Sequence, residues 1–317
     1  MKIVFLDCST VGDLTNIDRL RDFGDLICYD KTAHDERLER TTDADIIITN
    51  KVVMDKAVMD NGKNLKLICI SATGMNNVDL EYAGRKNIGV MNVGNYSTYS
   101  VTQSTFSMLF YLLNHTRYYD DYVKNGEYVK SPIFTHHGRP FYELKNKVFG
   151  IIGLGTIGKS VARLAKAFEC RVIYYSTSGN NIDPEFRSVD LDELLDVSDI
   201  ISIHAPLNDR TINLIDYTEI KRMKSSAIMI NVGRGGIINE SGLARALNED
   251  LILGAAIDVL SQEPISADNP LLRVRNRGKL LITPHIAWAS IESRTLLMDK
   301  IYENISLFLK DQAHQSS

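Results

Sequence analysis

Three residues of types that catalyse reactions of keto acids follow separate apolar runs in the second half of the chain. They are Arg234 in the segment Asn-Val-Gly-Arg-Gly, Glu263 in Ser-Gln-Glu-Pro, and His285 in Thr-Pro-His. A guanidinium offers a planar fork of donors to a carboxylate and its neighbouring carbonyl. An imidazole exchanges a proton near neutral pH, and a carboxylate beside it can hold its charge and tautomer. The trio therefore suits the interconversion of a 2-keto acid and a 2-hydroxy acid.

Each of these residue types also occurs at positions without chemistry. An arginine after a strand usually forms a surface ion pair, a Glu-Pro pair usually lies in a loop, and a histidine is usually a satisfied loop or core residue. The combination outweighs these interpretations because it follows a nucleotide-binding fingerprint in the chain. We therefore expect Arg234, Glu263 and His285 to act together.

The fingerprint is a glycine-rich sequence between an apolar run and a helix-like run. It reads Gly153-Leu154-Gly155-Thr156-Ile157-Gly158. The first glycine permits a tight turn, the second lets the backbone approach a pyrophosphate, and the third lets the next helix pack on the strand. Thr156 and Ile157, which stand between these glycines, are further expected cofactor contacts. The N-terminus of the helix that follows supplies N–H groups and partial positive charge. A plain glycine turn is the alternative, and the flanking runs 147–152 and 159–168 argue against it.

The residue that would select between the two nicotinamide cofactors departs from the pattern for NAD. A carboxylate about 20 residues after the glycines usually binds the ribose 2′-hydroxyl, but the strand-like run 171–175 ends in Ser176. Hydroxyl groups here could bind a 2′-phosphate, yet no arginine follows at once to pair with it. The expected cofactor is thus NAD or NADP, with a slight preference for NADP.

Short apolar runs alternate with polar stretches of helical length in two series. The first series comprises 2–7, 26–30, 44–50, 65–71 and 88–93, and the second comprises 147–153, 171–175, 199–205, 226–232, 252–258 and 279–283. Each series predicts parallel strands joined by crossover helices, so the expected fold class is α/β with two doubly wound parallel-sheet domains. Between the series, a buried helix is expected over about 97–119, and the aperiodic stretch 120–146 is expected to form an extended arm.

Composition and charge exclude several classes of function. The chain has 317 residues, 44% of them hydrophobic, and a net charge of −4 with an isoelectric point near 6.0. It holds no lysine or arginine block, so we expect neither nucleic acid nor a membrane as a partner. Four widely spaced cysteines without a C-x-x-C pair predict buried thiols in a reduced, cytoplasmic compartment, and no metal site. The N-terminal apolar run is too short for a signal peptide, and no segment is long enough for a membrane span.

Taken together, the motifs resemble the D-isomer-specific 2-hydroxyacid dehydrogenase family over nearly the whole chain. The resemblance extends from the loop Ala72-Thr73-Gly74-Met75-Asn76-Asn77-Val78-Asp79 to the Thr-Pro-His segment. It implies a flavodoxin-like substrate domain made of residues 1–95 and 284–317, and a Rossmann cofactor domain made of residues 96–283. The long helix and the arm would then build a homodimer.

The resemblance also implies roles for individual residues. Arg234 would bind the carboxylate and carbonyl of the substrate, His285 would be the acid/base, and Glu263 would be its carboxylate partner. The backbone amides expected to meet the substrate carboxylate are those of Thr73, Gly74 and Met75. Further cofactor contacts are expected from Pro206, Thr211, Val232 and Asp258.

The segment His285-Ile286-Ala287-Trp288 is most similar to the branch of glycerate dehydrogenases and hydroxypyruvate reductases. An indole one helical turn past His285, if a helix begins there, would cover a small substrate; Trp288 could also fill a domain interface. We therefore expect hydroxypyruvate or glyoxylate as the keto acid and D-glycerate or glycolate as the hydroxy acid. Two alternatives stay open because one methylene changes discrimination by only about 1–3 kcal/mol. They are reduction of a bulkier keto acid, such as phenylpyruvate or a branched-chain one, and a non-enzymatic redox-sensing binding protein of the same fold.

Overall fold

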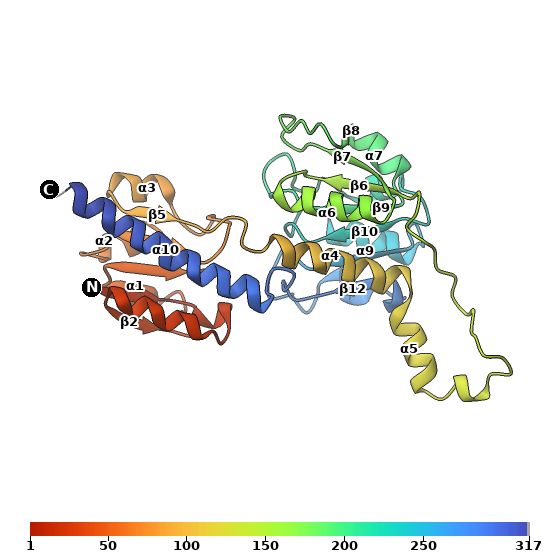
Figure 1. The fold of residues 1–317 in the computed structure, drawn as a ribbon, viewed down its shortest axis with the longest axis horizontal. Helices are drawn as coiled ribbons and strands as arrows, with labels where there is room; N and C mark the ends of the chain where they lie inside the picture. The colour runs from red at the N-terminus through yellow and green to blue at the C-terminus, as the bar shows by residue number, and fades with distance from the viewer. Residues whose placement is uncertain (316–317) are drawn as a thin grey trace. The chain divides into compact units, whose positions relative to one another are not determined.

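The computed structural model describes residues 1–315 and divides into two compact units (Figure 1). One unit consists of Met1–Ser97 together with the residues from Ala289 onward, and the other consists of Thr98–Trp288. Each unit is built around one parallel β-sheet. The expected α/β class with two parallel-sheet domains is therefore confirmed.

The first unit contains a five-stranded sheet in the order β2-β1-β3-β4-β5. Its strands are β1 (Lys2–Phe5), β2 (Asp25–Cys28), β3 (Ile46–Thr49), β4 (Leu67–Ile70) and β5 (Gly89–Met91). This order is that of flavodoxin-like folds. Every residue of β3 and β4 is buried, which explains why both strands form unbroken apolar runs in the sequence instead of alternating patterns.

Helices from both ends of the chain pack on this first sheet. They are α1 (Arg37–Thr41), α2 (Lys56–Asn61), α3 (Leu80–Arg85) and α10 (Ile291–Gln315), with 3-10 helices at Cys8–Val11 and Thr15–Phe23. Helix α10 packs against β4 and the second 3-10 helix, so the unit is discontinuous in sequence. Although α10 spans 25 residues, neither it nor any other helix within residues 1–315 is long and apolar enough to cross a membrane.

The second unit contains a seven-stranded sheet in the order β12-β11-β10-β9-β6-β7-β8. Its strands are β6 (Val148–Ile152), β7 (Arg171–Tyr175), β8 (Arg187–Ser188), β9 (Ile200–Ile203), β10 (Ile228–Asn231), β11 (Gly254–Ile257) and β12 (Leu280–Ile282). The short edge strand β8 was not expected from the sequence. The chain builds β6, β7 and β8 in one direction and β9 to β12 in the other, so the strand order reverses between β6 and β9. Open α/β sheets bind ligands at such a reversal, outside the carboxyl ends of the strands.

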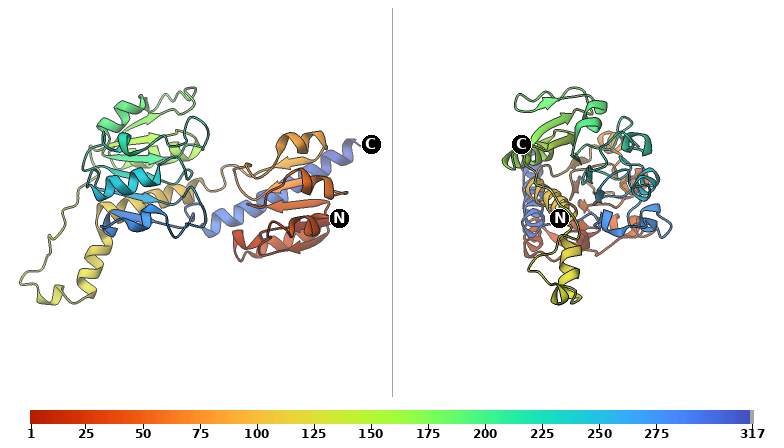
Figure 2. Two further views of the ribbon diagram at one scale, coloured as in Figure 1. Left: turned by 180° about the vertical axis from the view of Figure 1, so that it is seen from behind. Right: turned by 90° about the vertical axis from the view of Figure 1, so that its right-hand side faces the viewer.

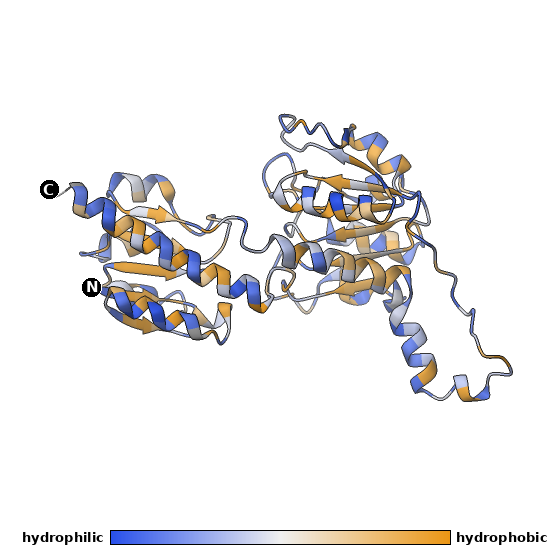
Figure 3. Cartoon of the chain, viewed as in Figure 1, coloured by the Kyte–Doolittle hydropathy of each residue, from blue (hydrophilic) through white to orange (hydrophobic). Residues whose placement is uncertain are grey.

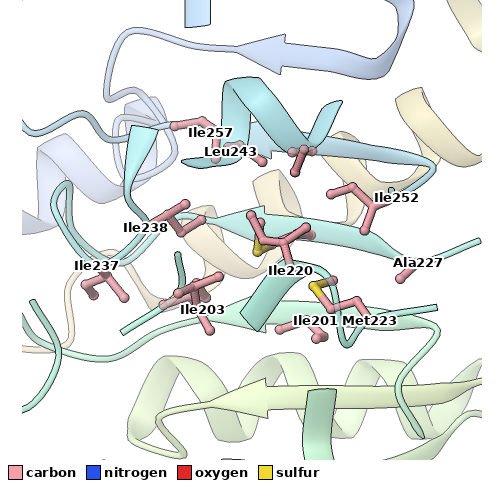
Figure 4. Close-up of a cluster of buried hydrophobic side chains, with 14 of the residues drawn as sticks. Ile201, Ile203, Ile220, Met223, Ala227, Ile237, Ile238, Leu243, Ile252 and Ile257 are labelled. Carbon is pink, nitrogen blue, oxygen red and sulfur yellow. The ribbon is translucent and has the colours of Figure 1, made fainter. Parts of the chain in front are cut away.

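Two apolar clusters cover opposite faces of the second sheet. The helices of this unit are α4 (Thr98–Leu113), α5 (Thr116–Lys124), α6 (Thr156–Ala167), α7 (Leu191–Val197), α8 (Tyr217–Ile220) and α9 (Glu240–Asn248). Figure 4 shows the first cluster, in which Ile201 and Ile203 of β9 meet Ile220 of α8 and Leu243 of α9. The second cluster joins α4 and α6 to the other face of the sheet. Alternate residues of each central strand enter the two clusters, as the two-residue period of a strand requires.

The long helix expected over 97–119 is interrupted. Helix α4 ends at Leu113, and α5 begins at Thr116 after two intervening residues, of which His115 has a φ of +48°. A left-handed residue cannot continue a right-handed helix, so the chain changes direction here. The expected arm at 120–146 therefore begins inside α5 and includes a short 3-10 helix, Tyr128–Lys130. The arm extends away from the body of its unit (Figure 2), and none of the residues in α5 is buried.

The boundaries between the units fall slightly later in the sequence than the expected domain limits. The sequence predicts divisions at 95/96 and 283/284, whereas the units divide after residues 97 and 288. The segment 284–288 stays with the second unit because its backbone is bonded there. The N–H group of His285, for example, donates to the carbonyl of Asp258 at 2.8 Å. The candidate acid/base thus belongs to the same unit as the other two members of the trio.

Candidate active site

Three loops at the carboxyl edge of the second sheet carry the catalytic candidates. Arg234 follows β10, Glu263 follows β11, and His285 follows β12. These strands are neighbours in the order β12-β11-β10 and run parallel. Because parallel strands end at the same edge of a sheet, the three loops leave the sheet side by side.

His285 and Glu263 are in direct contact. Nδ1 of the imidazole lies 2.7 Å from Oε2 of the carboxylate, and the two side chains are 26% and 32% exposed. The other carboxylate oxygen accepts a 2.9 Å hydrogen bond from the backbone N–H of Leu260, which fixes its orientation. With Nδ1 bonded to the carboxylate, Nε2 is the nitrogen that can exchange a proton with another molecule. This is the geometry of an acid/base oriented by a carboxylate.

A buried aspartate holds the loop that carries His285. Asp258 is 1% exposed. Its carboxylate accepts 2.9 Å hydrogen bonds from the N–H groups of Ile286 and Ala287, and a 2.5 Å bond from the hydroxyl of Thr283. The φ of His285 is +54°, which is uncommon for a residue with a side chain. The three bonds stabilise that conformation, so Asp258 positions His285; a contact of Asp258 with the cofactor stays a prediction.

The side chain of Arg234 is exposed, but its backbone lies in a tightly bonded loop. The amide of Asn231 donates to the carbonyl of Arg234 at 2.9 Å and accepts from the N–H of Gly233 at 3.0 Å. A Cβ atom on Gly235 would lie 1.9 Å from the carbonyl oxygen of Leu260, so only glycine fits beside the arginine. The loop fixes the origin of this exposed side chain, and Nη1 of the guanidinium donates a 2.8 Å hydrogen bond to the carbonyl of Gly233. The other donors of the fork can pair with a carboxylate.

The glycine-rich loop has the shape that a dinucleotide needs. Gly153 has a φ of +90°, and a Cβ atom on Gly158 would lie 2.3 Å from the carbonyl oxygen of Gly153, so the turn itself requires both glycines. A Cβ atom on Gly155 would instead point into open space. Gly155 precedes Thr156 and Ile157, the first residues of α6, and no side chain caps the N–H groups at this helix start. The loop thus leaves room for a pyrophosphate beside N–H groups that can bind it.

Ser176 lies directly after β7, where the sequence lacks a carboxylate. Its Oγ accepts a 3.3 Å hydrogen bond from the N–H of Asn181, and the Asn181 side chain donates a 2.5 Å bond to the carbonyl of Leu154. Asn181 thus ties the turn after β7 to the glycine-rich loop. Sequence reasoning missed this residue, because nothing around an asparagine in a loop indicates which distant loop it will contact.

The remaining cofactor candidates lie in the loops after β9 and β10. Thr211 is buried, and its hydroxyl donates to the carbonyl of Pro206 at 2.7 Å and accepts from the N–H of Asn208 at 2.8 Å. This residue therefore shapes its loop from within. Val232 is buried directly after β10. A contact of Pro206, Thr211 or Val232 with the cofactor stays a prediction.

A second histidine stands at the same edge of the sheet. His204 follows β9, and its Nε2 lies 2.8 Å from the hydroxyl of Ser202. Burial lowers the pKa of His204 to about 3, so this imidazole is neutral throughout the range in which enzymes of keto acids work. A permanently neutral histidine cannot serve as the proton donor of a reduction.

The residues expected to contact the substrate carboxylate lie in the first unit, in the loop after β4. The hydroxyl of Thr73 donates a 3.0 Å hydrogen bond to the carbonyl of Val93, and the amide of Asn92 donates a 2.6 Å bond to the carbonyl of Thr73. These bonds tie the loop, which continues through Gly74 and Met75, to the segment after β5. The role of the loop in substrate binding stays a prediction.

Trp288 does not share a helix with His285. The residues between them form turns, and α10 begins only at Ile291, because a left-handed residue at 285 cannot start a right-handed helix. The partly buried indole packs against the apolar cluster that contains Phe106 and Ala287. The expectation of one common helical turn is therefore wrong, and the packing gives the indole a structural role in its own unit. A contact of Trp288 with the substrate stays a prediction.

A doubly wound domain with a glycine-rich loop after its first strand, an arginine and a carboxylate–histidine pair is typical of nicotinamide-dependent dehydrogenases. Comparison with known proteins identifies the family. The domain described as "D-isomer specific 2-hydroxyacid dehydrogenase, NAD binding domain" matches residues 106–287. The chain belongs to the D-isomer specific 2-hydroxyacid dehydrogenase family, as the sequence resemblance indicated.

Similar proteins span nearly the same length as this chain. A hydroxypyruvate reductase of Blautia hydrogenotrophica is 38% identical over 317 residues, which cover 98% of this chain and 97% of the relative. A glycerate dehydrogenase of Methylorubrum extorquens is 35% identical over 312 residues, which cover 97% and 96%. Among solved structures, an acyclic imino acid reductase in complex with NADPH and D-Arg has a TM-score of 0.87 at 29% identity, with 98% of each chain covered.

Replacing Glu263 with glutamine is expected to slow keto-acid reduction. The carboxylate orients the imidazole through its contact at Nδ1, so its loss should lower kcat with a smaller change in KM, whereas His285→Ala should lower kcat by about 10²–10⁴-fold. The matched control is His204→Gln at the other histidine of the edge, which should leave kcat close to that of the wild type. A Glu263→Gln variant that keeps the kcat of the wild type would remove Glu263 from this role.

Two glycine substitutions should separate the turn from the binding surface of the glycine-rich loop. Gly158→Ala places a methyl group against the backbone of Gly153 and should lower the free energy of unfolding by about 1–3 kcal/mol. In Gly155→Ala the added methyl group meets open space, so the free energy of unfolding should change by less than about 1 kcal/mol. The same variant should bind NADH and NADPH at least about tenfold more weakly, which corresponds to a loss of about 1.4 kcal/mol. Thermal melting and fluorescence titration measure the two effects. Undiminished binding by Gly155→Ala would contradict a pyrophosphate site here.

Proposed function

We propose that this protein is an NAD(P)-dependent D-2-hydroxyacid dehydrogenase that interconverts hydroxypyruvate or glyoxylate with D-glycerate or glycolate. The observation that carries the proposal is the 2.7 Å contact between His285 and Glu263, on the sheet edge that also presents Arg234. The similarity to proteins named hydroxypyruvate reductase and glycerate dehydrogenase, at 38% and 35% identity, supports this substrate class.

Each member of the trio has one task in the proposed reaction. In the reductive direction, Arg234 binds the substrate carboxylate and stabilises the negative charge that develops on the keto oxygen. Protonated His285 donates the proton at Nε2 to that oxygen, while Glu263 holds the imidazolium at Nδ1. A bound nicotinamide cofactor supplies the hydride. In the oxidative direction, neutral His285 accepts the hydroxyl proton of the hydroxy acid.

The cofactor that we propose is NADPH, with NADH accepted as well. Ser176 leaves the end of β7 without a carboxylate that would repel a 2′-phosphate. The family domain is described as NAD binding, and one similar solved structure contains NADPH, so relatives of both kinds support a nicotinamide cofactor. The preference for NADPH rests on Ser176 and on the turn that this residue begins.

A panel of keto acids with both cofactors tests the proposed activity. Hydroxypyruvate and glyoxylate should be reduced with higher kcat/KM than phenylpyruvate or 2-ketoisocaproate, and D-glycerate rather than L-glycerate should be oxidised. Trp288→Ala should reduce this discrimination by about tenfold if the indole limits the pocket, and Trp288→Phe should retain most of it. A preference of the wild type for phenylpyruvate would favour a reductase of bulkier substrates. Nucleotide binding without turnover of any keto acid would favour a redox-sensing binding protein.

The quaternary structure that we propose is a homodimer formed through the arm. The arm exposes large apolar side chains that its own unit does not cover, and Figure 3 shows hydrophobic stretches along this extended segment. They are Val129, Ile133, Phe134, Phe141 and Tyr142, of which Val129 and Phe134 are 88% and 89% exposed. Clusters of this kind usually mark a protein–protein interface. Because α5 also lacks a buried residue, a second copy of the chain is the occupant that the family resemblance favours.

The oligomeric state of arm variants tests the dimer. Light scattering coupled to size-exclusion chromatography should give twice the chain mass for the wild type. Val129→Asp combined with Phe134→Asp should shift the population to monomer, because each buried carboxylate would have to lose its hydration. Leu272→Asp places the same charge at an exposed apolar residue of the same unit outside the arm and should leave the dimer intact. A monomeric wild type, or an arm variant that stays dimeric, would contradict this interface.

The compartment that we propose is the cytoplasm, on the basis of the cysteines. All four are free thiols. Cys69 and Cys170 are buried, and burial raises the pKa of Cys69 and raises that of Cys170 to about 11, so both stay protonated at neutral pH. The expectation that the cysteines are buried is wrong for Cys28, which is exposed at the end of the short strand β2, and Cys8 is only partly buried. Free thiols are typical of proteins kept in a reducing environment.

A further inference from the structure

Arg210 connects the two loops that flank the glycine-rich loop. It lies in the loop after β9, and its Nη1 donates a 3.2 Å hydrogen bond to the carbonyl oxygen of Ser178, in the turn after β7. Strand β6 lies between β9 and β7 in the sheet (Figure 1), so this bond crosses over the carboxyl end of β6. The guanidinium is thereby held at the end of β7, where doubly wound folds bind the adenosine ribose of a dinucleotide.

We propose that Arg210 pairs with the 2′-phosphate of NADP and thereby determines the cofactor preference of this protein. The inference rests on the proposed function, since it requires a dinucleotide bound at the glycine-rich loop. No arginine stands beside Ser176 in the sequence. The fold instead brings Arg210, which lies 32 residues after Ser178, into contact with this turn. An exposed guanidinium at this position presents a fork of N–H donors that matches the oxygen atoms of a phosphate.

The charge of Arg210 is available to a phosphate. Within residues 1–315 its guanidinium forms no ion pair, and its hydrogen bond is made to a carbonyl instead of a carboxylate. Asp183, the carboxylate at the far end of the same turn, is paired with Lys159 at 2.8 Å, and this partner holds the pKa of Asp183 below its ordinary value. Asp209 is exposed, so water and salt screen its charge.

Two serine hydroxyls belong to the turn that accepts the bond from Arg210, and each can donate to an external acceptor. Ser176 Oγ accepts a 3.3 Å hydrogen bond from the N–H of Asn181, and Ser178 Oγ accepts a 3.2 Å bond from the N–H of Asn180. Each hydroxyl therefore keeps its own hydrogen for an external acceptor. The turn passes through Gly179, whose φ is +74° and whose missing Cβ would meet no atom within 4 Å. The backbone at Gly179 thus leaves open space at the tip of this turn.

The experiment measures the binding of adenosine fragments to the full-length protein by calorimetry. Adenosine 2′,5′-bisphosphate carries the 2′-phosphate, and 5′-AMP lacks it. The wild type should bind the bisphosphate more tightly. Arg210→Gln should weaken the bisphosphate by about tenfold to hundredfold, as expected for one charge-assisted pair, and should leave 5′-AMP unchanged. Arg277→Gln removes the same charge from an exposed residue before β12, at the opposite edge of the sheet, and should change neither affinity.

Two further variants sharpen the test. Arg210→Lys keeps the charge without the planar fork and should fall between the wild type and Arg210→Gln. Ser176→Asp should weaken the bisphosphate by repulsion while improving 5′-AMP through its 2′-hydroxyl. The assignment is overturned if both fragments bind and Arg210→Gln leaves the ratio of their affinities unchanged; the proposed function then still stands. If the wild type binds neither fragment, the dinucleotide site fails, and the inference about Arg210 fails with it.

Discussion

The reversal of strand order between β6 and β9 determines where every functional loop of the second unit lies. From β6 the chain crosses through α6 to β7, and from β10 it crosses through α9 to β11 in the opposite direction. Crossovers of the same right-handed sense that move in opposite directions must place their helices on opposite faces of the sheet. The apolar clusters agree, because α6 belongs to one and α9 to the other. The loops after β6, β7 and β9 therefore lie next to one another at the carboxyl edge of the sheet. The loops after β10, β11 and β12 follow in order along the same edge.

The loop that carries His285 combines strain with a strong local restraint. A left-handed residue with a side chain costs about 1–3 kcal/mol, and the φ of His285 lies in this region. Each hydrogen bond to a carboxylate contributes about 1.5–3 kcal/mol, and Asp258 accepts three from residues 283–287. The restraint therefore outweighs the strain. At this turn the backbone stops following the direction of β12, and the imidazole of His285 contacts Glu263.

The sequence predicts the elements of this protein better than the contacts between them. Unbroken apolar runs identify eleven of the twelve strands found within residues 1–315, because a strand buried on both faces needs no polar position. The two-residue strand β8 has no such run, and the left-handed His115 that ends α4 follows from a turn that residue types alone do not reveal. The contact between Glu263 and His285 follows from neighbouring strand ends. The contact of Arg210 with Ser178 does not follow from the strand order, because it depends on the lengths and paths of two loops.

The discontinuous first unit has a consequence for the order of events during turnover. His285, Glu263 and Arg234 all belong to Thr98–Trp288, and the register of β10, β11 and β12 sets their mutual positions. Rotation of the backbone at the two connections between the units, near residues 97 and 288, leaves those positions unchanged. The histidine–carboxylate pair is thus preorganised within one unit. Its contact therefore adds no ordering cost at the step in which a proton moves.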